Sequence, residues 1–317
     1  MRIIFLDADT ISQRQALDDT LNARGTYITY PTTDASQTLE RIAEATIVIT
    51  NKVVITREMM RQTPSLRLIC IAATGTNNVD LAAAHELGIE VRNVTSYSTE
   101  SVVQTTFALL LALLSQTAQF NTFIHSGGYS ASPLFTCLTP SYAELSGKTF
   151  GIIGLGTIGR RVAQVAEAFG AHVVYCSTSG VERKEAYDRV ALDELLQTAD
   201  VVSIHAPLTE QTASLIHYDR LMMMKHSAYL INTGRGGIIV EQDLARALDE
   251  GVIAGAGLDV FSREPLPTDN PLLHSRHPER LIMTPHIAWA SIEAQRRLCQ
   301  GILSNIDAVM ADKKDEA

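Results

Sequence analysis

Short apolar runs alternate with amphipathic segments through the first third of the chain. We expect strands at RIIFLD, YITYP, TIVITNK and LRLICIAAT, and a shorter one at IEVRNV. Helical spacing marks the stretches between them, such as DASQTLERIAEA, TREMMRQTP and VDLAAAHELG, the last of which Gly88 closes. Short apolar strands that alternate with helices are typical of a parallel sheet covered on both faces.

A long apolar helix, from about Ser98 to Thr117, follows this first set of elements. The next segment, from about Ser126 to Ser141, contains Gly, Ser and Pro with weak periodicity, and we expect an exposed arm or loop there. At Gly147 the alternation restarts. Six strand candidates follow: KTFGIIG, AHVVYC, DVVSIHAPL, AYLINTG, IAGAGLDV and RLIMTPH. They predict a second, doubly wound domain, and a last helix is expected over about 291–311.

Composition favours a globular protein of the cytoplasm. The chain has 317 residues, of which 46% are hydrophobic, and its net charge is −9. The acidic balance argues against a nucleic-acid or anionic-membrane partner. The longest apolar run, FALLLALL, is too short to span a bilayer, and MRIIFLDADT does not resemble a signal peptide. The four cysteines form no CxxC pair, so we expect buried free thiols in a reducing compartment.

A glycine-rich turn opens the second domain. The strand candidate Thr149–Ile153 runs into Gly154-Leu-Gly156-Thr-Ile-Gly159, and RRVAQVAEAFG continues as an amphipathic helix. In the sequence GxGxxG, the first glycine permits a tight turn, the second lets backbone approach a pyrophosphate, and the third lets helix and strand pack closely. An ordinary tight turn is the simpler interpretation, but a strand before and a helix after favour dinucleotide binding.

The acid that usually follows the second strand of such a fold is missing. AHVVYC ends in Ser177-Thr178-Ser179, with no Asp or Glu to bind a ribose hydroxyl. The three hydroxyls, with Arg183 and Lys184 nearby, could receive the 2′-phosphate of NADP, or they are solvated loop residues. The choice between NAD and NADP therefore stays open.

Charged side chains follow several later strands. Arg235 lies in INTGRGGIIV, Asp259 and Glu264 in GLDVFSREPLP, and His286 in TPHIAWAS. Singly, each is an ordinary loop residue. Jointly they lie at the carboxyl edge of one sheet, where ligands bind. We expect the histidine to exchange the hydroxyl proton, the acid to fix its tautomer, and the arginine to bind a substrate carboxylate.

At this point the sequence resembles the D-isomer-specific 2-hydroxyacid dehydrogenases, and within them the glycerate dehydrogenase or hydroxypyruvate reductase branch. The resemblance runs from about Thr50 to the last helix. Its motifs are ATGTNNVD, STESVVQTTFALLLAL, GIIGLGTIGRRVAQVAEAFGAHV, HAPLTEQT, LINTGRGG, AGAGLDVFSREP and TPHIAWAS. The catalytic Arg, Glu and His of that family fall on Arg235, Glu264 and His286, and all three residue types are intact.

The resemblance implies an α/β fold of two doubly wound parallel sheets. A flavodoxin-like substrate domain would comprise residues 1–98 and 288–317. A Rossmann dinucleotide-binding domain, residues 99–287, would be inserted into it. The helix and arm at about 99–146 would build a homodimer.

The resemblance also implies further binding residues. The substrate carboxylate would be bound by backbone N–H groups of Ala73, Thr74, Gly75 and Thr76, and Trp289 would wall the pocket, unless it is plain packing. Asp259 would hold the nicotinamide amide. The remaining cofactor contacts would come from Gly154, Gly156, Thr157, Ile158, Gly159, Ser177, Thr178, Ala206, Pro207 and Thr233. Ser177 stands where NAD-using relatives carry Asp.

The expected reaction is reduction of a small 2-oxo acid, hydroxypyruvate or glyoxylate, to the D-2-hydroxy acid with NADH or NADPH, and its reverse. One alternative is a dinucleotide-sensing binding protein, such as the corepressors built on this fold, with little turnover. Another is a formate or phosphite dehydrogenase, although the formate branch carries Gln where this chain has Glu264. The run His274-Ser-Arg-His277 lacks acids and cysteines, so we interpret it as a loop and expect no metal site.

Overall fold

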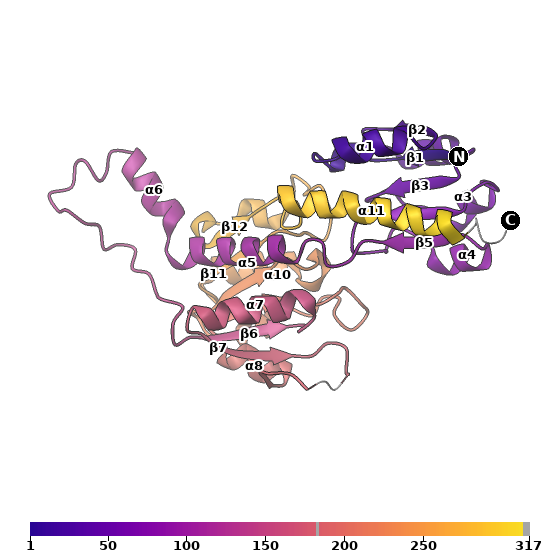
Figure 1. The fold of residues 1–317 in the computed structure, drawn as a ribbon. Coiled ribbons are helices and arrows are strands. Elements are labelled where there is room, and N and C mark those ends of the chain that lie inside the picture. The colour runs from indigo at the N-terminus through magenta and orange to yellow at the C-terminus, as the bar shows by residue number, and fades with distance from the viewer. Residues whose placement is uncertain (182–183, 313–317) are drawn as a thin grey trace. The chain divides into compact units, whose positions relative to one another are not determined.

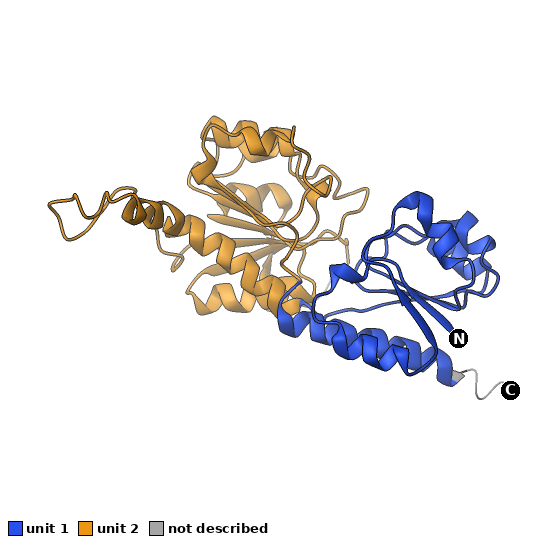
Figure 2. Ribbon diagram, turned by 90° about the horizontal axis from the view of Figure 1, so that it is seen from above, with its two compact units in different colours: residues 1–98, 290–317 blue, residues 99–289 orange. Residues whose placement is uncertain are grey.

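The computed structural model describes residues 1–181 and 184–312, and the chain divides into two compact units (Figure 2). Unit 1 comprises Met1–Ser98 and Ala290–Ala317, and unit 2 comprises Thr99–Trp289. The sequence predicts that the chain returns to the first unit at residue 288, and the observed boundary lies two residues later, at Ala290. The chain thus enters and leaves unit 2 once each, as an insertion into unit 1.

Unit 1 is a five-stranded parallel sheet in the order β2-β1-β3-β4-β5. Its strands are β1 (Arg2–Phe5), β2 (Thr26–Thr29), β3 (Ile47–Thr50), β4 (Leu68–Ile71) and β5 (Glu90–Asn93). Its α-helices are α1 (Gln15–Asn22), α2 (Ala35–Ile42), α3 (Arg57–Arg61), α4 (Leu81–Glu86) and α11 (Ile292–Asp312). The central strands β3 and β4 are buried throughout, because helices cover both faces of the sheet.

The helix starts of unit 1 follow from local side-chain chemistry. Asp34 and Gln37 form a capping box at the start of α2. The Thr56 hydroxyl accepts a hydrogen bond from the Met59 N–H at α3, and the Asp80 carboxylate accepts one from the Ala83 N–H at α4. Each cap satisfies backbone donors that a helix N-terminus leaves without a partner.

Unit 2 is a seven-stranded parallel sheet in the order β12-β11-β10-β9-β6-β7-β8. Its strands are β6 (Thr149–Ile153), β7 (His172–Cys176), β8 (Asp188–Arg189), β9 (Val201–Ile204), β10 (Tyr229–Asn232), β11 (Gly255–Leu258) and β12 (Leu281–Met283). Its α-helices are α5 (Thr99–Leu114), α6 (Thr117–His125), α7 (Thr157–Ala168), α8 (Leu192–Thr198), α9 (Tyr218–Met222) and α10 (Glu241–Asp249).

Two apolar clusters fill the two sides of this sheet. One joins α5 and α7 to the strands through residues such as Phe107, Val162 and Phe150. The other joins α8, α9 and α10 to the opposite side through residues such as Leu195, Leu221 and Leu244. The strand order reverses beside β6, and this is the point where open α/β sheets bind ligands. Parallel sheets in both units confirm the predicted fold class.

The six strands expected in this half of the chain all form, but the sequence missed β8. This strand has only two residues, both charged and exposed, and it pairs with the edge of β7. An apolar run could not reveal it because it buries nothing.

The predicted arm extends from the body of unit 2, as Figure 1 shows for α6 and the segment after it. The expected single helix to Thr117 was wrong in detail: α5 ends at Leu114, Gln116 takes a left-handed φ of 53°, and α6 starts afresh. Among the described residues no single helix is long and apolar enough to cross a membrane. The pair α5 and α6 meets that test only together and is bent by 60°.

Candidate active site

The glycine turn between β6 and α7 has the geometry that its sequence predicted. Gly154 takes φ +95°, and a Cβ there would lie 2.8 Å from the backbone of Ala206. A Cβ on Gly159 would lie 2.3 Å from the carbonyl oxygen of Gly154. Both positions therefore require glycine for close packing.

Gly156 differs from its two neighbours, because a Cβ there would meet nothing within 4 Å. It is the N-cap of α7, so the first N–H groups of the helix, beginning with Thr157 and Ile158, lie beside open space. Free N–H groups at a helix N-terminus and an open approach to backbone suit a pyrophosphate. The residues present therefore fit a dinucleotide, on geometry as well as on motif.

A hollow lies at the carboxyl edge of β6, β7 and β9. It is lined by Gly154, Leu155, Gly156, Tyr175, Ser177, Thr178, Ser179, Val181, Glu185, His205 and Pro207. Of the predicted cofactor residues, the hollow brings together Gly154, Gly156, Ser177, Thr178 and Pro207. Arg183 lies outside the described residues, and Lys184 is exposed and does not line the hollow.

An acid does line this hollow, although the sequence shows none at the end of β7. Glu185 forms a two-pronged ion pair with Arg160 in the first turn of α7, with Nε–Oε2 at 2.9 Å and Nη2–Oε1 at 2.5 Å. The side chain of Glu185 is only 11% exposed. Sequence reasoning missed this pair because the two residues are 25 positions apart and belong to no common motif.

His205 was also missed as an individual residue, although it opens the quoted motif HAPLTEQT. Burial lowers the pKa of its imidazole to about 4, so the ring is neutral at physiological pH. Its Nε2 lies 2.8 Å from the Ser203 hydroxyl. Its place directly after β9, beside Ala206 and Pro207, was the signal that could have identified it.

Arg235 lies at the carboxyl end of β10 on a turn that Asn232 organises. The Asn232 side chain donates to the Arg235 carbonyl at 2.9 Å and accepts from the Gly234 N–H at 3.0 Å. A Cβ on Gly236 would lie 1.9 Å from the carbonyl carbon of Phe261. Glycine therefore lets the Arg235 turn pack directly against the segment that leads to Glu264.

Glu264 and His286 form a hydrogen-bonded pair. The Nδ1 of His286 lies 2.6 Å from Oε2 of Glu264, while Oε1 of Glu264 accepts from the Phe261 N–H at 2.9 Å. The backbone contact fixes the carboxylate, and the carboxylate orients the imidazole. The side chains are 22% and 32% exposed for His286 and Glu264, so solvent and small molecules reach the pair.

Asp259 organises the loop that carries the histidine. Its carboxylate accepts from the Thr284 hydroxyl at 2.6 Å and from the N–H groups of Ile287 and Ala288 at 2.9 and 2.8 Å. Burial raises the pKa of Asp259, and these three hydrogen bonds oppose the rise. Asp259 thus anchors the loop on both sides of His286, and the backbone of His286 has a left-handed φ of 54°. The side chain of Asp259 has no exposed surface here, and its predicted contact with a nicotinamide amide stays a prediction.

Thr233, also predicted at the cofactor, follows β10 and is buried. Its hydroxyl lies 3.0 Å from that of Thr106 on α5, and Thr106 in turn donates to the Val102 carbonyl at 2.8 Å. Since the Thr106 proton is used in that bond, Thr233 is the donor to Thr106. The lone pairs of Thr233 are then left to accept from a ligand.

The predicted substrate loop lies in unit 1, directly after β4. Within the described residues, the N–H groups of Ala73, Thr74, Gly75 and Thr76 donate to no protein acceptor. Carbonyls in the same loop are taken, because the Val94 N–H donates to Ala73 and the Asn93 side chain donates to Thr74. A loop with unused donors and occupied acceptors suits an anion. Trp289, the last residue of unit 2, is half-buried.

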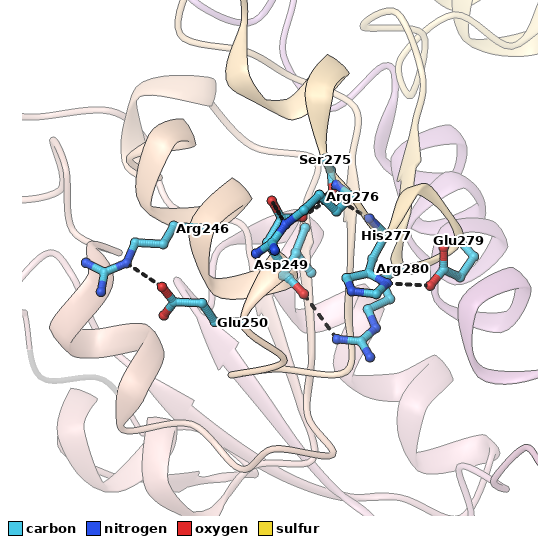
Figure 3. Close-up of polar contacts among 9 residues, drawn as sticks. Arg246, Asp249, Glu250, Ser275, Arg276, His277, Glu279 and Arg280 are labelled. Carbon is cyan, nitrogen blue, oxygen red and sulfur yellow. Dashed lines mark hydrogen bonds and ion pairs between the residues drawn. The ribbon is translucent and has the colours of Figure 1, made fainter.

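The histidine-rich run after α10 is a structural loop, as Figure 3 shows. Asp249 accepts from the Ser275 hydroxyl at 2.9 Å and from the Arg276 N–H at 2.7 Å, and His277 pairs with Glu279 at 3.1 Å. Where the structure describes the chain, it contains no group of three His, Cys, Asp or Glu side chains that could hold a metal ion.

Comparison with known proteins agrees with this arrangement. The family model for the D-isomer specific 2-hydroxyacid dehydrogenase NAD-binding domain matches residues 107–288. The hydroxypyruvate reductase of Blautia hydrogenotrophica is 37% identical over 312 residues, with 97% of this chain and 96% of that protein covered. The glycerate dehydrogenase of Methylorubrum extorquens is 36% identical over 316 residues, with 98% and 97% covered.

Among solved structures, an acyclic imino acid reductase (Bsp5) in complex with NADPH and D-Arg superimposes with a TM-score of 0.88 at 28% identity, covering 99% of this chain and 98% of that one. The matches span both units, and the family model alone covers more than half of the chain. The resemblance found in the sequence motifs is confirmed: the chain belongs to the D-isomer-specific 2-hydroxyacid dehydrogenases.

Proposed function

We propose that this enzyme reduces hydroxypyruvate or glyoxylate to the corresponding D-2-hydroxy acid with NADH or NADPH, and catalyses the reverse reaction. The observation that carries this proposal is the Glu264–His286 hydrogen bond at the carboxyl edge of the unit 2 sheet. The names of the similar hydroxypyruvate reductase and glycerate dehydrogenase support the substrate class.

His286 is the proposed proton donor. Because Nδ1 faces Glu264, Nε2 is the ring nitrogen left to face a substrate. The charged imidazole gives its Nε2 proton to the carbonyl oxygen during reduction, and the neutral ring removes that proton during oxidation. Glu264 holds the ring in the Nδ1–H tautomer and stabilises the imidazolium.

Arg235 is the proposed ligand of the substrate carboxylate and of the reacting carbonyl. It is half-buried at the strand end next to the Glu264 turn, and its guanidinium has donors to spare beyond the one on the Gly234 carbonyl. In unit 1, the unused N–H groups of Ala73–Thr76 support a role in binding a substrate carboxylate.

A nicotinamide cofactor bound at this site would supply the hydride. Around it, Thr233 and Asp259 are the proposed ligands of its amide, and the glycine turn with Thr157 and Ile158 binds the pyrophosphate. Asp259 has a second proposed task that its hydrogen bonds support directly: it holds the His286 loop in position before any substrate arrives.

The first test is a spectrophotometric assay of NADH and NADPH oxidation with hydroxypyruvate, glyoxylate and pyruvate. We expect turnover with the first two. His286→Gln should lower kcat by about 1,000-fold or more while ADP, measured by calorimetry, still binds. Arg235→Ala should raise KM and also lower kcat, since the guanidinium meets substrate in both ground and transition states.

His277→Gln is the matched control, because it removes an exposed histidine from the same unit without touching the strand edge. Unchanged kcat in His286→Gln would remove the proton-transfer assignment. Tight nucleotide binding with no turnover on any short 2-oxo acid would instead favour a dinucleotide-sensing binding protein. Turnover with formate or phosphite alone would favour the third alternative.

We also propose that the enzyme acts in the cytoplasm as a homodimer, with α5 and the arm of unit 2 in the interface. The support for a dimer is the apolar character of the arm, where Phe135 is 90%, Leu138 78% and Leu134 65% exposed. Apolar side chains exposed together to this degree are typical of association surfaces. The four cysteines, free in the structure, support a reducing compartment.

A further inference from the structure

We propose that this enzyme prefers NADP(H) to NAD(H), and that Arg189 binds the 2′-phosphate together with the hydroxyls that follow β7. The inference rests on the dinucleotide site proposed above and concerns its adenosine end. It identifies a residue that determines cofactor specificity and that no sequence motif marks.

The residues that follow β7 carry hydroxyl groups. Enzymes that select NAD usually have an acidic residue at this position. Ser177, Thr178 and Ser179 all line the hollow beside the glycine turn. A carboxylate at this position accepts the ribose 2′-hydroxyl and repels a 2′-phosphate. Hydroxyl groups do neither, and each can donate a hydrogen bond to a phosphate oxygen.

Among the residues that the structure describes, one acid lines this hollow, and a cation already neutralises it. Glu185 is bound on both carboxylate oxygens by Arg160, and its side chain is 11% exposed. An ion pair with both prongs satisfied has little net charge to repel a phosphate. Glu185 therefore does not replace the missing selector.

The pairing of β8 with β7 places Arg189 near the end of β7. In the β7–β8 pairing, Arg189 lies opposite Tyr175. Partners in a parallel pair, and residues two apart on one strand, share a face of the sheet. Arg189 thus lies on the face that carries Tyr175, one residue before the end of β7. Arg189 and Ser177 both line a second hollow, and Ser177 also lines the first.

The guanidinium of Arg189 is available for a ligand. It is exposed, and within residues 1–181 and 184–312 no carboxylate forms an ion pair or hydrogen bond with it. Burial raises the pKa of the Cys176 thiol and the charge of Arg189 opposes the rise, which agrees with a guanidinium close to the end of β7. A planar guanidinium binds phosphate through two parallel hydrogen bonds, so this position suits a 2′-phosphate better than a lysine would.

The test measures binding of two adenosine fragments, 2′,5′-ADP and 5′-AMP, by isothermal titration calorimetry on the full chain. The two differ only in the 2′-phosphate and lack the nicotinamide. We expect the wild type to bind 2′,5′-ADP at least about 10-fold more tightly. Arg189→Gln should lose most of that preference while its affinity for 5′-AMP stays the same. The preference should also shrink with added salt, because Arg189 is exposed.

Ser177→Asp provides the converse test and should reverse the preference toward 5′-AMP. Arg161→Gln is the matched control. It removes one positive charge from the same unit, but Arg161 pairs with Glu100 on α5 rather than facing the hollow. It should leave the ratio of the two affinities unchanged.

Equal wild-type affinity for the two fragments would overturn the proposal, as would an equal loss of both in Arg189→Gln. Neither result touches the proposed reaction, which is measured by turnover of hydroxypyruvate and by His286→Gln. Absence of binding for both fragments would instead remove the dinucleotide site itself.

Discussion

His205 shows how the fold controls the charge of a single residue. The imidazole is half-buried at the end of β9, where it lines the hollow, and burial lowers its pKa to about 4, whereas an exposed histidine titrates near 6.5. The folded state thus excludes a proton that the unfolded chain binds readily. Below the ordinary histidine pKa, this difference favours unfolding.

We therefore expect the free energy of unfolding to fall as pH drops from about 6.5 toward 4. From the two pKa values, His205 alone accounts for a loss of about 2 kcal/mol between pH 7.5 and 5. Urea denaturation across this range should show a steeper pH dependence for the wild type than for His205→Gln, which retains an amide to meet Ser203. Comparing slopes removes any constant cost of the substitution. Parallel slopes would contradict the assigned pKa.

The site residues that were predicted from the sequence have one property in common: each lies in a recognisable motif. Arg235, Glu264 and His286 each follow a recognisable apolar strand, so the edge of the sheet that carries them could be inferred without coordinates. Glu185 and Arg189 lie outside any such motif. Glu185 meets Arg160 through the path of a loop, and the pairing of a two-residue strand places Arg189 in the same hollow as Ser177. Such contacts depend on register, which a single sequence leaves open.

At the scale of the element, the glycine turn between β6 and α7 separates folding from binding. A Cβ on Gly159 would collide with the carbonyl oxygen of Gly154, whereas a Cβ on Gly156 would project into open space. The same chemical change at two positions three residues apart should therefore have two different results.

We expect Gly159→Ala to destabilise unit 2 by about 1–3 kcal/mol, since backbone must shift to admit the methyl group. Gly156→Ala should change stability by less than about 1 kcal/mol, the usual effect at a helix N-cap. It should nevertheless weaken ADP binding at least about 10-fold, because the methyl group occupies the approach of the pyrophosphate. Chemical denaturation and calorimetry on both variants measure the two effects. Full ADP affinity in Gly156→Ala would show that the pyrophosphate lies elsewhere.

The elements themselves could largely be predicted, and the exceptions have physical causes. Strands such as Ile47–Thr50 are buried on both faces, so an apolar run reveals them. The two-residue strand Asp188–Arg189 is exposed and leaves no such signal. The break between α5 and α6 falls at Gln116, whose left-handed backbone no composition rule requires.

At the scale of the whole molecule, the arm of unit 2 determines the expected assembly. Replacing Leu134, Phe135 and Leu138 together by serine should convert a dimer to a monomer at micromolar concentration, because the exposed apolar area that drives association is removed. Sedimentation velocity measures the change. Val54→Ser is the matched control, since Val54 is 56% exposed but lies in unit 1. A monomeric wild type would contradict the proposal.

The left-handed backbone of His286 affects which substitutions we expect in related sequences, as well as the chemistry of the site. A non-glycine residue in that conformation costs about 1 kcal/mol or more, and here the three hydrogen bonds of Asp259 to the loop offset the cost. Once selection for turnover relaxes, Gly or Asn at this position would make the fold more stable. In a related protein that has lost enzymatic activity and only senses nucleotides, we therefore expect position 286 to be substituted first, while the glycine turn is retained.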